Sequence, residues 1–269
     1  MRAGTRTPED IKVKGQLGPR ALRVLIRVQE LVSARGSYDY VEIGSFLGRS
    51  LQSHLQDADC RRALSIDLRP DTTPDERGAM DIYQGITADD MIAGLAELCS
   101  ADDLIKLETV TDTSDILRDM EADQFDLAFI DGEHTHTAAF RDFLNVLGVI
   151  RPNGVICFDD TTLVLTGIRN ALTVLETRGV PHAFAFGRGG ITVVALGKEA
   201  QAFIDALGEG MTIPEGRIER RTRRRMQEVA LREAKPHLIA EDPKVRDKAI
   251  AALRADGWVV EPASTNEPA

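Results

Sequence analysis

The sequence predicts an α/β protein with a mainly parallel, doubly wound sheet that carries helices on both faces. Short apolar segments of strand length alternate along the chain with amphipathic segments of helical period, a pattern typical of βαβ units. The strand segments are almost continuously apolar, as expected of parallel strands buried on both faces. Four of them end at a glycine or at acids, namely Gly44, Asp67, Asp131 and the pair Asp159-Asp160. Because ligands bind beyond the carboxyl ends of such strands, these residues are expected to share one crevice.

The individual elements follow from the hydrophobic period. Apolar residues recur at three- and four-residue steps, which predicts a helix at 19–34 and further helices that include the segments 47–55, 91–98, 140–147 and 164–175. Strands are expected at 38–44, 63–67, 104–110, 125–131 and 155–160, with a closing hairpin of 182–186 and 191–196. Residues 68–86 are polar and rich in turn-forming residues, which predicts a loop that serves as a lid. The segment Pro152-Asn153-Gly154 predicts a turn.

The chain is expected to have three parts. These are a helical lead-in over 1–37, a main domain over 38–198 and a mainly helical extension over 199–269. Within the extension, Asp242-Pro243 is a favourable helix start. We interpret the extension as a segment used in oligomer contacts or in covering the site, and we expect a homo-oligomer.

Composition and charge exclude several classes of protein. The chain has 269 residues, enough for a full core, with 43% hydrophobic and 28% charged residues. No apolar run approaches the ~20 residues that span a bilayer, and no secretory signal is recognised, so neither a membrane nor export is expected. The isolated Cys60, Cys99 and Cys157 are expected as buried apolar residues, which indicates the cytoplasm. The net charge of −10 argues against nucleic-acid binding, and we interpret the Arg-rich segment 217–225 as a solvated helix face.

The segment VEIGSFLGRS (41–50) has the pattern of a cofactor-binding turn. Gly44 allows a tight strand-to-helix turn with close approach of the backbone to a ligand, and Gly48 allows the start of the helix to pack closely. The dinucleotide fingerprint G-x-G-x-x-G is absent, since Ser45 and Phe46 stand where a pyrophosphate needs bare backbone. A cofactor with an ammonium and a carboxylate but no phosphate suits Glu42. Asp67, at the end of the next strand, is placed to accept hydrogen bonds from ribose hydroxyls.

At this point the sequence resembles a known family. VEIGSFLGRS resembles motif I of class I methyltransferases. FDLAFIDGEHTHTAAFRDF, followed by IRPNGVICFDDT, resembles the small O-methyltransferases related to catechol and antibiotic-sugar O-methyltransferases. The resemblance covers about residues 38–196. It implies a Rossmann-like, seven-stranded sheet with a reversed final hairpin, and S-adenosyl-L-methionine (SAM) as the cofactor.

The resemblance also implies site residues. Glu42, Gly44 and Gly48 would line the methionine end of SAM, and Asp67 would hold the ribose. The expected cofactor-binding set is completed by Ser45, Ser50, Thr113, Ser114 and Asp131. The third strand end, 111–114, departs from the G-x-S usual in the family, so the residue that meets the adenine is left open.

Three acids at neighbouring strand ends form a candidate metal site. Asp131, Asp159 and Asp160 would repel one another and raise one another's pKa unless a cation neutralised them. Carboxylate oxygens suit Mg²⁺, Mn²⁺ or Ca²⁺. In the metal-dependent relatives, the matching acids hold a divalent cation that binds the acceptor hydroxyl and lowers its pKa. Two alternatives remain open: Asp160 caps the following helix, or Asp131-Gly132 is only a turn.

Glu133 or His134 is expected as the general base of the reaction. An acid two residues after the first metal ligand has this role in some sugar O-methyltransferases, and a histidine has a suitable ordinary pKa. The sequence leaves the choice open.

These observations predict a SAM-dependent methyltransferase. The finer prediction is an O-methyltransferase of secondary metabolism that methylates a hydroxyl of a small-molecule substrate, such as a sugar moiety or a phenol. It is expected to need a divalent metal ion, with Mg²⁺ favoured. One alternative is a non-catalytic partner protein that keeps the SAM fold. Another is an NAD-dependent oxidoreductase, although its second and third glycines and a Tyr-x-x-x-Lys pair are missing. The identity of the acceptor cannot be inferred from the sequence.

Overall fold

The computed structural model describes residues 6–238 and 243–255. It divides into two compact units, Met1–Arg220 and Arg221–Ala269. The three-part division at residues 37 and 198 stays a prediction, and the parts of the predicted extension at 239–242 and 256–269 lie outside the described residues. None of the described helices is both long and apolar enough to cross a membrane.

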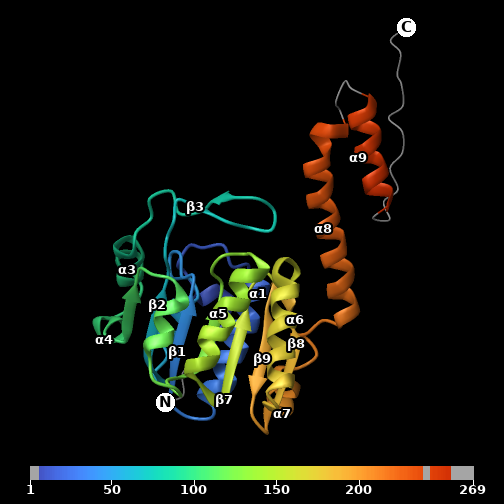
Figure 1. Ribbon diagram of the computed structural model, residues 1–269. Helices are drawn as coiled ribbons and strands as arrows, with labels where there is room; N and C mark the ends of the chain where they lie inside the picture. Colours follow the sequence, from blue (N-terminus) through green and yellow to red (C-terminus); the bar gives the residue numbers. More distant parts are fainter. Residues whose placement is uncertain (1–5, 239–242, 256–269) are drawn as a thin grey trace. The chain divides into compact units, whose positions relative to one another are not determined.

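The first unit is built on one seven-stranded sheet, as predicted (Figure 1). Its strands lie in the order β5-β2-β1-β6-β7-β9-β8. All neighbours are parallel except β9, which runs antiparallel to both β7 and β8. This is the Rossmann-like arrangement with a reversed final hairpin. The strands are β1 (Tyr38–Ile43), β2 (Cys60–Ile66), β5 (Leu107–Val110), β6 (Phe125–Ile130), β7 (Ile150–Phe158), β8 (His182–Phe186) and β9 (Thr192–Leu196).

Helices cover both faces of this sheet and bury two separate apolar clusters. Along each strand, successive side chains enter opposite clusters, so Tyr40 belongs to one and Val41 to the other. The first cluster includes side chains of α1 (Pro19–Ser33), α2 (Leu51–Leu55), α3 (Ala88–Ala96) and α7 (Ala200–Leu207). The second includes α5 (His136–Val149) and α6 (Thr161–Thr177), which lie in front of the sheet in Figure 1, with α1 behind it.

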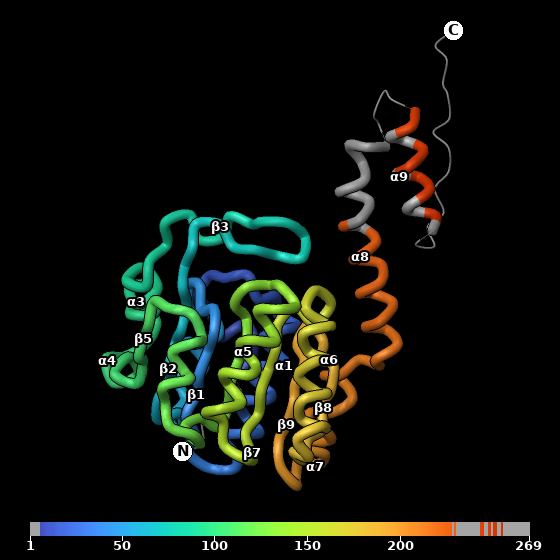
Figure 2. The backbone as a smooth tube through the Cα atoms, in the orientation of Figure 1, coloured from blue at the N-terminus to red at the C-terminus, as the bar shows by residue number. Residues whose placement is uncertain are grey.

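The loops at the carboxyl ends of the strands gather along one edge of the sheet. Figure 2 shows the segment between β2 and α3 extending over this edge. This segment is the predicted loop 68–86, and it contains the short paired strands β3 (Thr72–Thr73) and β4 (Met80–Asp81). The described residues of this unit also include the 3-10 turns η1 (Pro8–Asp10), η2 (Ser114–Asp119) and η3 (Arg188–Gly190).

Three predicted elements differ from the structure for a local reason. The strand expected over 104–110 begins only at Leu107, because Ser100 and Asp103 form a capping box that starts α4 (Ala101–Leu104). The turn predicted at 152–154 lies inside β7, where residues 151–154 bulge out of register with β6. The helix expected from Leu47 begins at Leu51, since Phe46 and Gly48 both have positive φ.

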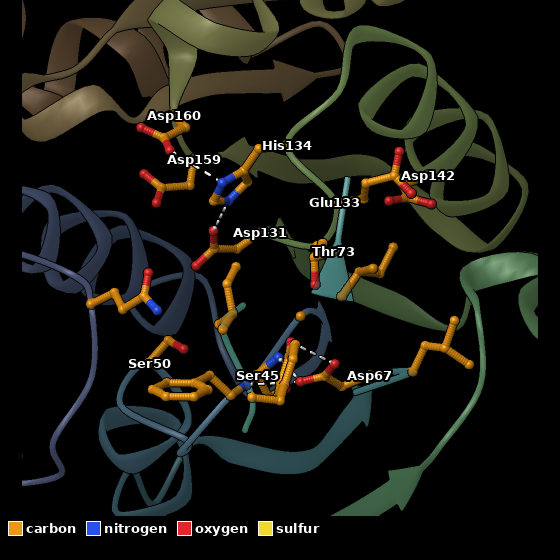
Figure 3. A pocket seen from close by; sticks show the side chains of 18 of the residues that line it. Ser45, Ser50, Asp67, Thr73, Asp131, Glu133, His134, Asp142, Asp159 and Asp160 are labelled. Atoms are coloured by element: carbon orange, nitrogen blue, oxygen red, sulfur yellow. Dashed lines mark hydrogen bonds and ion pairs between the residues drawn. The ribbon is translucent and has the colours of Figure 1, made fainter. Parts of the chain in front are cut away.

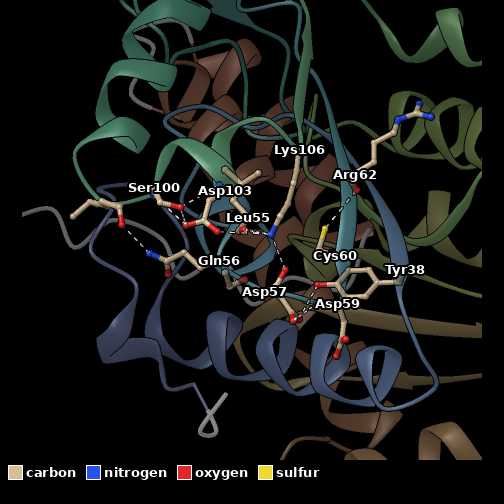
Figure 4. A network of polar contacts seen from close by, with 12 residues as sticks. Tyr38, Leu55, Gln56, Asp57, Asp59, Cys60, Arg62, Ser100, Asp103 and Lys106 are labelled. Carbon is tan, nitrogen blue, oxygen red and sulfur yellow. Dashed lines mark hydrogen bonds and ion pairs between the residues drawn. The ribbon is translucent and has the colours of Figure 1, made fainter. Parts of the chain in front are cut away.

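A polar network closes the opposite end of the sheet (Figure 4). The Lys106 ammonium donates to the carbonyls of Leu55 and Asp57 at 2.7 and 2.9 Å. The Tyr38 hydroxyl donates to Asp57 and also lies 3.0 Å from His54 Nδ1. Burial lowers the pKa of His54 to about 3, so this histidine is a neutral core residue. Cys60, Cys99 and Cys157 are buried and free, as predicted.

Helix α8 (Glu215–Leu238) carries the Arg-rich segment, and α9 (Pro243–Ala255) follows in the second unit. The arginines at 217, 220, 221 and 223 are exposed, as expected of a solvated helix face. Within the first unit, Arg169 of α6 forms ion pairs with Glu215 and Glu219.

Gly44, the residue after β1, is held where no other residue fits. Its φ is +84°, and a Cβ built on it would lie 2.0 Å from the carbonyl oxygen of Asp131. The ends of β1 and β6 therefore pack closely because position 44 has no side chain. This close packing lets both strand ends border the same crevice.

We predict that Gly44→Ala destabilises the protein by at least about 3 kcal/mol, because it combines an unfavourable left-handed φ with a clash against backbone. Gly85→Ala is the matched control, since Gly85 has φ +83° but no atom within 4 Å of its Cβ position. It should cost only about 1–2 kcal/mol. Urea unfolding of both variants measures the difference. Equal losses would show that the contact with Asp131 is unimportant.

Candidate active site at the strand ends

The parallel register brings the predicted site residues together. Ile43 lies beside both Ile66 and Ile130, and Ile130 lies beside Phe158. The next residues along the strands, Gly44, Asp67, Asp131 and Asp159, therefore emerge side by side. They line a cavity of about 450 Å³. Of the predicted set, the wall of this cavity also includes Ser45, Ser50, Thr113, Ser114, Glu133, His134 and Asp160.

Glu42 and Gly48 are not part of the cavity wall. Glu42 is fully buried, and it accepts hydrogen bonds from Ser50 Oγ at 2.8 Å and from the Tyr40 hydroxyl. Burial raises the pKa of Glu42 to about 7, against the effect of these donors. Gly48 has φ +81°, and a Cβ there would meet Leu95 of α3 at 2.9 Å. Glu42 thus supports Ser50 from behind, and Gly48 allows α3 to pack closely.

Asp67 organises the turn that follows β1. Its Oδ2 accepts hydrogen bonds from the backbone N–H groups of Ser45 and Phe46, both at 2.9 Å. Arg69, which lies two residues after it, donates its guanidinium to the Phe46 carbonyl at 2.7 Å. The turn between β1 and α2 is therefore held by the end of β2. This is the turn at which the sequence predicts a close approach of the protein backbone to a ligand.

His134 lies between carboxylates on the other side of the cavity (Figure 3). Its Nε2 lies 3.3 Å from Asp131 Oδ1. Its Nδ1 lies 3.3 Å from Asp75 Oδ2 and 3.4 Å from Asp160 Oδ2. Burial, together with the neighbouring acids, raises the pKa values of Asp131 and Asp159 well above the ordinary range. This end of the cavity therefore attracts positive charge.

Glu133 points away from this group, although it is next to His134 in the sequence. Its Oε1 accepts a hydrogen bond from Thr135 Oγ1 at 2.7 Å, and in Figure 3 it lies beside Asp142. Asp160 occupies the N-cap position of α6, but its side chain makes no capping hydrogen bond. Asp160 therefore caps the helix through its backbone carbonyl, and its side chain is not used for capping.

The polar residues after β5 form hydrogen bonds with other groups of the protein. Ser114 is buried, and its Oγ donates to Asp142 Oδ1 at 2.6 Å and accepts from Asn145 Nδ2 at 2.8 Å. Burial raises the pKa of Asp142, with Ser114 and Arg141 acting against that effect. Thr113 begins η2, where its side chain accepts from the Asp115 N–H. The cavity wall at this strand end is thus rigid and hydrogen-bonded.

The loop 68–86 contributes site residues that the sequence did not single out. Asp75 is buried and forms a two-fold ion pair with Arg77, whose Nε and Nη2 donate at 2.7 and 2.6 Å. Burial opposes ionisation of Asp75, but the bonds from Arg77 outweigh it, and the pKa of Asp75 is lowered. Thr73 is 7% exposed, and within the described chain its hydroxyl has no hydrogen-bond partner. It lies in the cavity wall, so a polar atom of a ligand would satisfy it.

The predicted metal site was tested against this arrangement. The donors at Asp131, Asp159 and Asp160 are oxygens of the type that Mg²⁺ prefers. However, no three His, Cys, Asp or Glu side chains of the described residues are arranged as ligands of one ion, and His134 contacts two of the three acids. As arranged here, the residues do not form a metal site.

Comparison with known proteins finds one matching family model and several solved structures of similar fold. Residues 41–161 match the model of a family described as methyltransferase domain. No curated protein sequence matches the chain. The SAM-bound O-methyltransferase TomG from Streptomyces achromogenes, involved in tomaymycin synthesis, is 17% identical, with 70% of this chain and 93% of that chain covered and a TM-score of 0.47. The O-methyltransferase from Bacillus cereus, in complex with SAH, is 19% identical, with 71% and 87% covered and a TM-score of 0.47.

The seven-stranded sheet with its reversed hairpin and a cavity at the strand ends defines a Rossmann-like α/β protein with a candidate ligand site. The family match over residues 41–161 covers the three segments that carry the resemblance noted in the sequence, and it supports a similarity of this part of the chain to methyltransferase domains.

We predict a pH-dependent cost from Glu42. Its folded pKa lies above the value near 4.5 of an unburied glutamate, so folding favours the neutral acid. The destabilisation is absent below about pH 4.5, develops between there and pH 7, and reaches about 3 kcal/mol above it. Relative to wild type, Glu42→Gln should therefore gain stability as the pH rises from 5 to 8.

Urea unfolding at pH 5, 6.5 and 8 measures this difference. Glu97→Gln, at an exposed position, should show no such trend. A stability difference for Glu42→Gln that does not change with pH would mean that Glu42 ionises in the folded protein as easily as in solvent.

Proposed function

We propose that the protein transfers the methyl group of SAM to a hydroxyl group of a small molecule, with His134 as the general base. The observation that carries this proposal is the position of His134, in the cavity wall and flanked by carboxylates on both ring nitrogens. A cavity of about 450 Å³ is within the usual range for small-molecule sites. A sugar moiety or a phenol is the proposed acceptor.

The cofactor would lie across the ends of β1 and β2. Gly44 leaves room for close approach of a ligand, and Asp67 is proposed to accept the ribose hydroxyls. The sulfonium and ammonium groups of SAM are positive, which suits a cavity whose acids Asp131 and Asp159 have raised pKa values. The free hydroxyl of Thr73 is available to either ligand.

In the proposed reaction the acceptor oxygen attacks the methyl carbon in line with the carbon–sulfur bond. The oxygen–carbon bond forms, the carbon–sulfur bond breaks with its electron pair going to sulfur, and the hydroxyl proton passes to the imidazole of His134. The products are the methyl ether and S-adenosylhomocysteine (SAH). Asp131 and Asp160, each within 3.4 Å of the ring, stabilise the positive charge that His134 gains. Holding both reactants in line supplies much of the acceleration.

Because Glu133 is engaged with Thr135, we assign the base to His134 and predict different losses for the two residues. His134→Gln should lower the turnover number by about 10²- to 10⁴-fold, with little change in SAM affinity. Glu133→Gln should lower it by less than about five-fold.

The measurement is SAH release with a panel of phenols and sugar alcohols, followed by SAH calorimetry on each variant. Equal losses in the two variants would contradict the assignment. If SAH binds but no hydroxylated acceptor is methylated, the proposed reaction is wrong and the non-catalytic alternative gains support.

A second version of this proposal includes a divalent cation that binds near Asp131, Asp159 and Asp160. The raised pKa values of Asp131 and Asp159 are what a bound cation would reverse. Because the three acids are not arranged as a ligand set, no step of the reaction is assigned to a cation. Bound there, it would supply Lewis-acid activation of the acceptor oxygen.

Calorimetric titration of the SAH complex with MgCl₂ tests this second version. Saturable binding that is lost in Asp159→Asn, but kept in the exposed-site control Asp102→Asn, would support the cation. We expect this result only if the three carboxylates rearrange around the ion. The absence of binding at millimolar Mg²⁺ would reject the cation.

The homo-oligomer predicted from the sequence is a separate proposal.

A further inference from the structure

The carboxylate of Asp67 has no hydrogen-bonding capacity left for a ribose. Its Oδ2 accepts from the N–H groups of Ser45 and Phe46. Its Oδ1 accepts from the Arg69 N–H at 3.2 Å and from the Tyr83 hydroxyl at 2.8 Å. An ionised carboxylate offers about four lone-pair sites, and the protein fills all of them. A ribose hydroxyl can bind to Asp67 only if one of these donors leaves.

Tyr83 is the donor that can leave. The other three are backbone N–H groups, fixed by the turn after β1 and by the chain that follows Asp67 itself. Tyr83 reaches Asp67 from the far end of the loop 68–86. It also presents the same chemistry as the ligand that it would yield to, because both a phenol and a ribose hydroxyl donate one O–H group to a carboxylate.

The surroundings of Tyr83 keep it in this position as a donor. Its ring lies edge-to-face with Phe46, with the centroids 5.6 Å apart, and the Arg69 guanidinium lies 5.8 Å from the ring centroid. Tyr83 is 7% exposed and lines the same cavity as Asp67. Burial and the charge of Asp67 raise its pKa, so the phenol stays protonated at physiological pH.

The segment that carries Tyr83 also contacts the opposite side of the cavity. Asp75 lies against His134 in an isolated β-bridge, the Glu76 N–H donates to the His134 carbonyl at 3.0 Å, and Glu76 Oε1 accepts from the His136 N–H at 2.8 Å. The loop 68–86 therefore contacts Asp67 through Tyr83 and the backbone around His134 through Asp75 and Glu76.

We propose that Tyr83 is a built-in competitor of the cofactor ribose for Asp67, and that SAM binds by displacing its hydroxyl. This inference rests on the proposed role of Asp67 and holds whichever acceptor is methylated.

The test is SAH affinity, measured by calorimetry on the full chain. Tyr83→Phe removes the competing hydroxyl and keeps the ring, so the Kd for SAH should fall about five-fold, the effect of one net hydrogen bond. Tyr38→Phe is the matched control: it removes another buried phenol–carboxylate bond, to Asp57, at the opposite end of β1, and should leave the Kd unchanged. An unchanged or weakened affinity in Tyr83→Phe would overturn the inference.

A SAH analogue that lacks both ribose hydroxyls separates competition from general loosening of the loop. With this 2′,3′-dideoxy analogue, Tyr83→Phe should bring no gain, because the analogue does not compete for Asp67. An equal gain for both ligands would overturn the inference. In wild type the analogue should bind within about three-fold of SAH, since Tyr83 keeps its bond to Asp67. A loss of a hundred-fold would overturn it without any variant.

Asp67→Asn distinguishes this inference from the proposed function. It should weaken SAH binding, because it replaces the acceptor of the ribose hydroxyls and of the Ser45 and Phe46 N–H groups. If SAH binding to Asp67→Asn is unchanged, the ribose role of Asp67 and the competition by Tyr83 both fail, but methyl transfer to a hydroxyl can still be observed and the proposed reaction stands.

Discussion

The site depends on the parallel register of β1 with β2 and β6. Ile43 is level with Ile66 and Ile130, and the backbone ladder continues one step further, with the Gly44 N–H bonded to the Ile66 carbonyl and the Asp131 N–H to the Ile43 carbonyl. A slip of one residue would turn each of the following side chains to the other face. The absence of a side chain at Gly44 lets the strand ends approach closely enough to form one cavity wall.

The same register concentrates negative charge, and the protein compensates for it in different ways. Around Asp67, backbone N–H groups and Tyr83 satisfy the carboxylate. Around Asp75, Arg77 does so with two hydrogen bonds. Asp131 and Asp159 have raised pKa values because burial and the charges of neighbouring acids are only partly offset. An environment that is unfavourable for its own acids is suited to a positively charged ligand, and the stability lost there is the expected cost of a binding site.

The sequence predicted the parts of this structure that depend on local pattern. Apolar runs that end in Gly44, Asp67 or Asp131 located the strands and the edge of the sheet where the cavity lies. The prediction was less successful where a side chain's direction decides the outcome. Glu42 is adjacent to the cavity in sequence but turns into the core, and Glu133 turns away from the position taken by its neighbour His134. Alternation along a strand and the φ/ψ of a turn decide such directions, and neither can be deduced from residue type.

The loop 68–86 was outside the reach of sequence reasoning for a different reason. Its roles arise from contacts between residues far apart in the chain, such as Asp75 with His134 and Tyr83 with Asp67. No periodicity or motif marks them, because polar residues in a loop follow no repeating pattern.

A crystal structure of the protein with SAH tests the central claim most directly. The account predicts that SAH lies across Gly44 with its ribose on Asp67 and its sulfur facing the side of the cavity that holds Asp131 and His134. SAH bound elsewhere, or with its ribose away from the end of β2, would contradict the account.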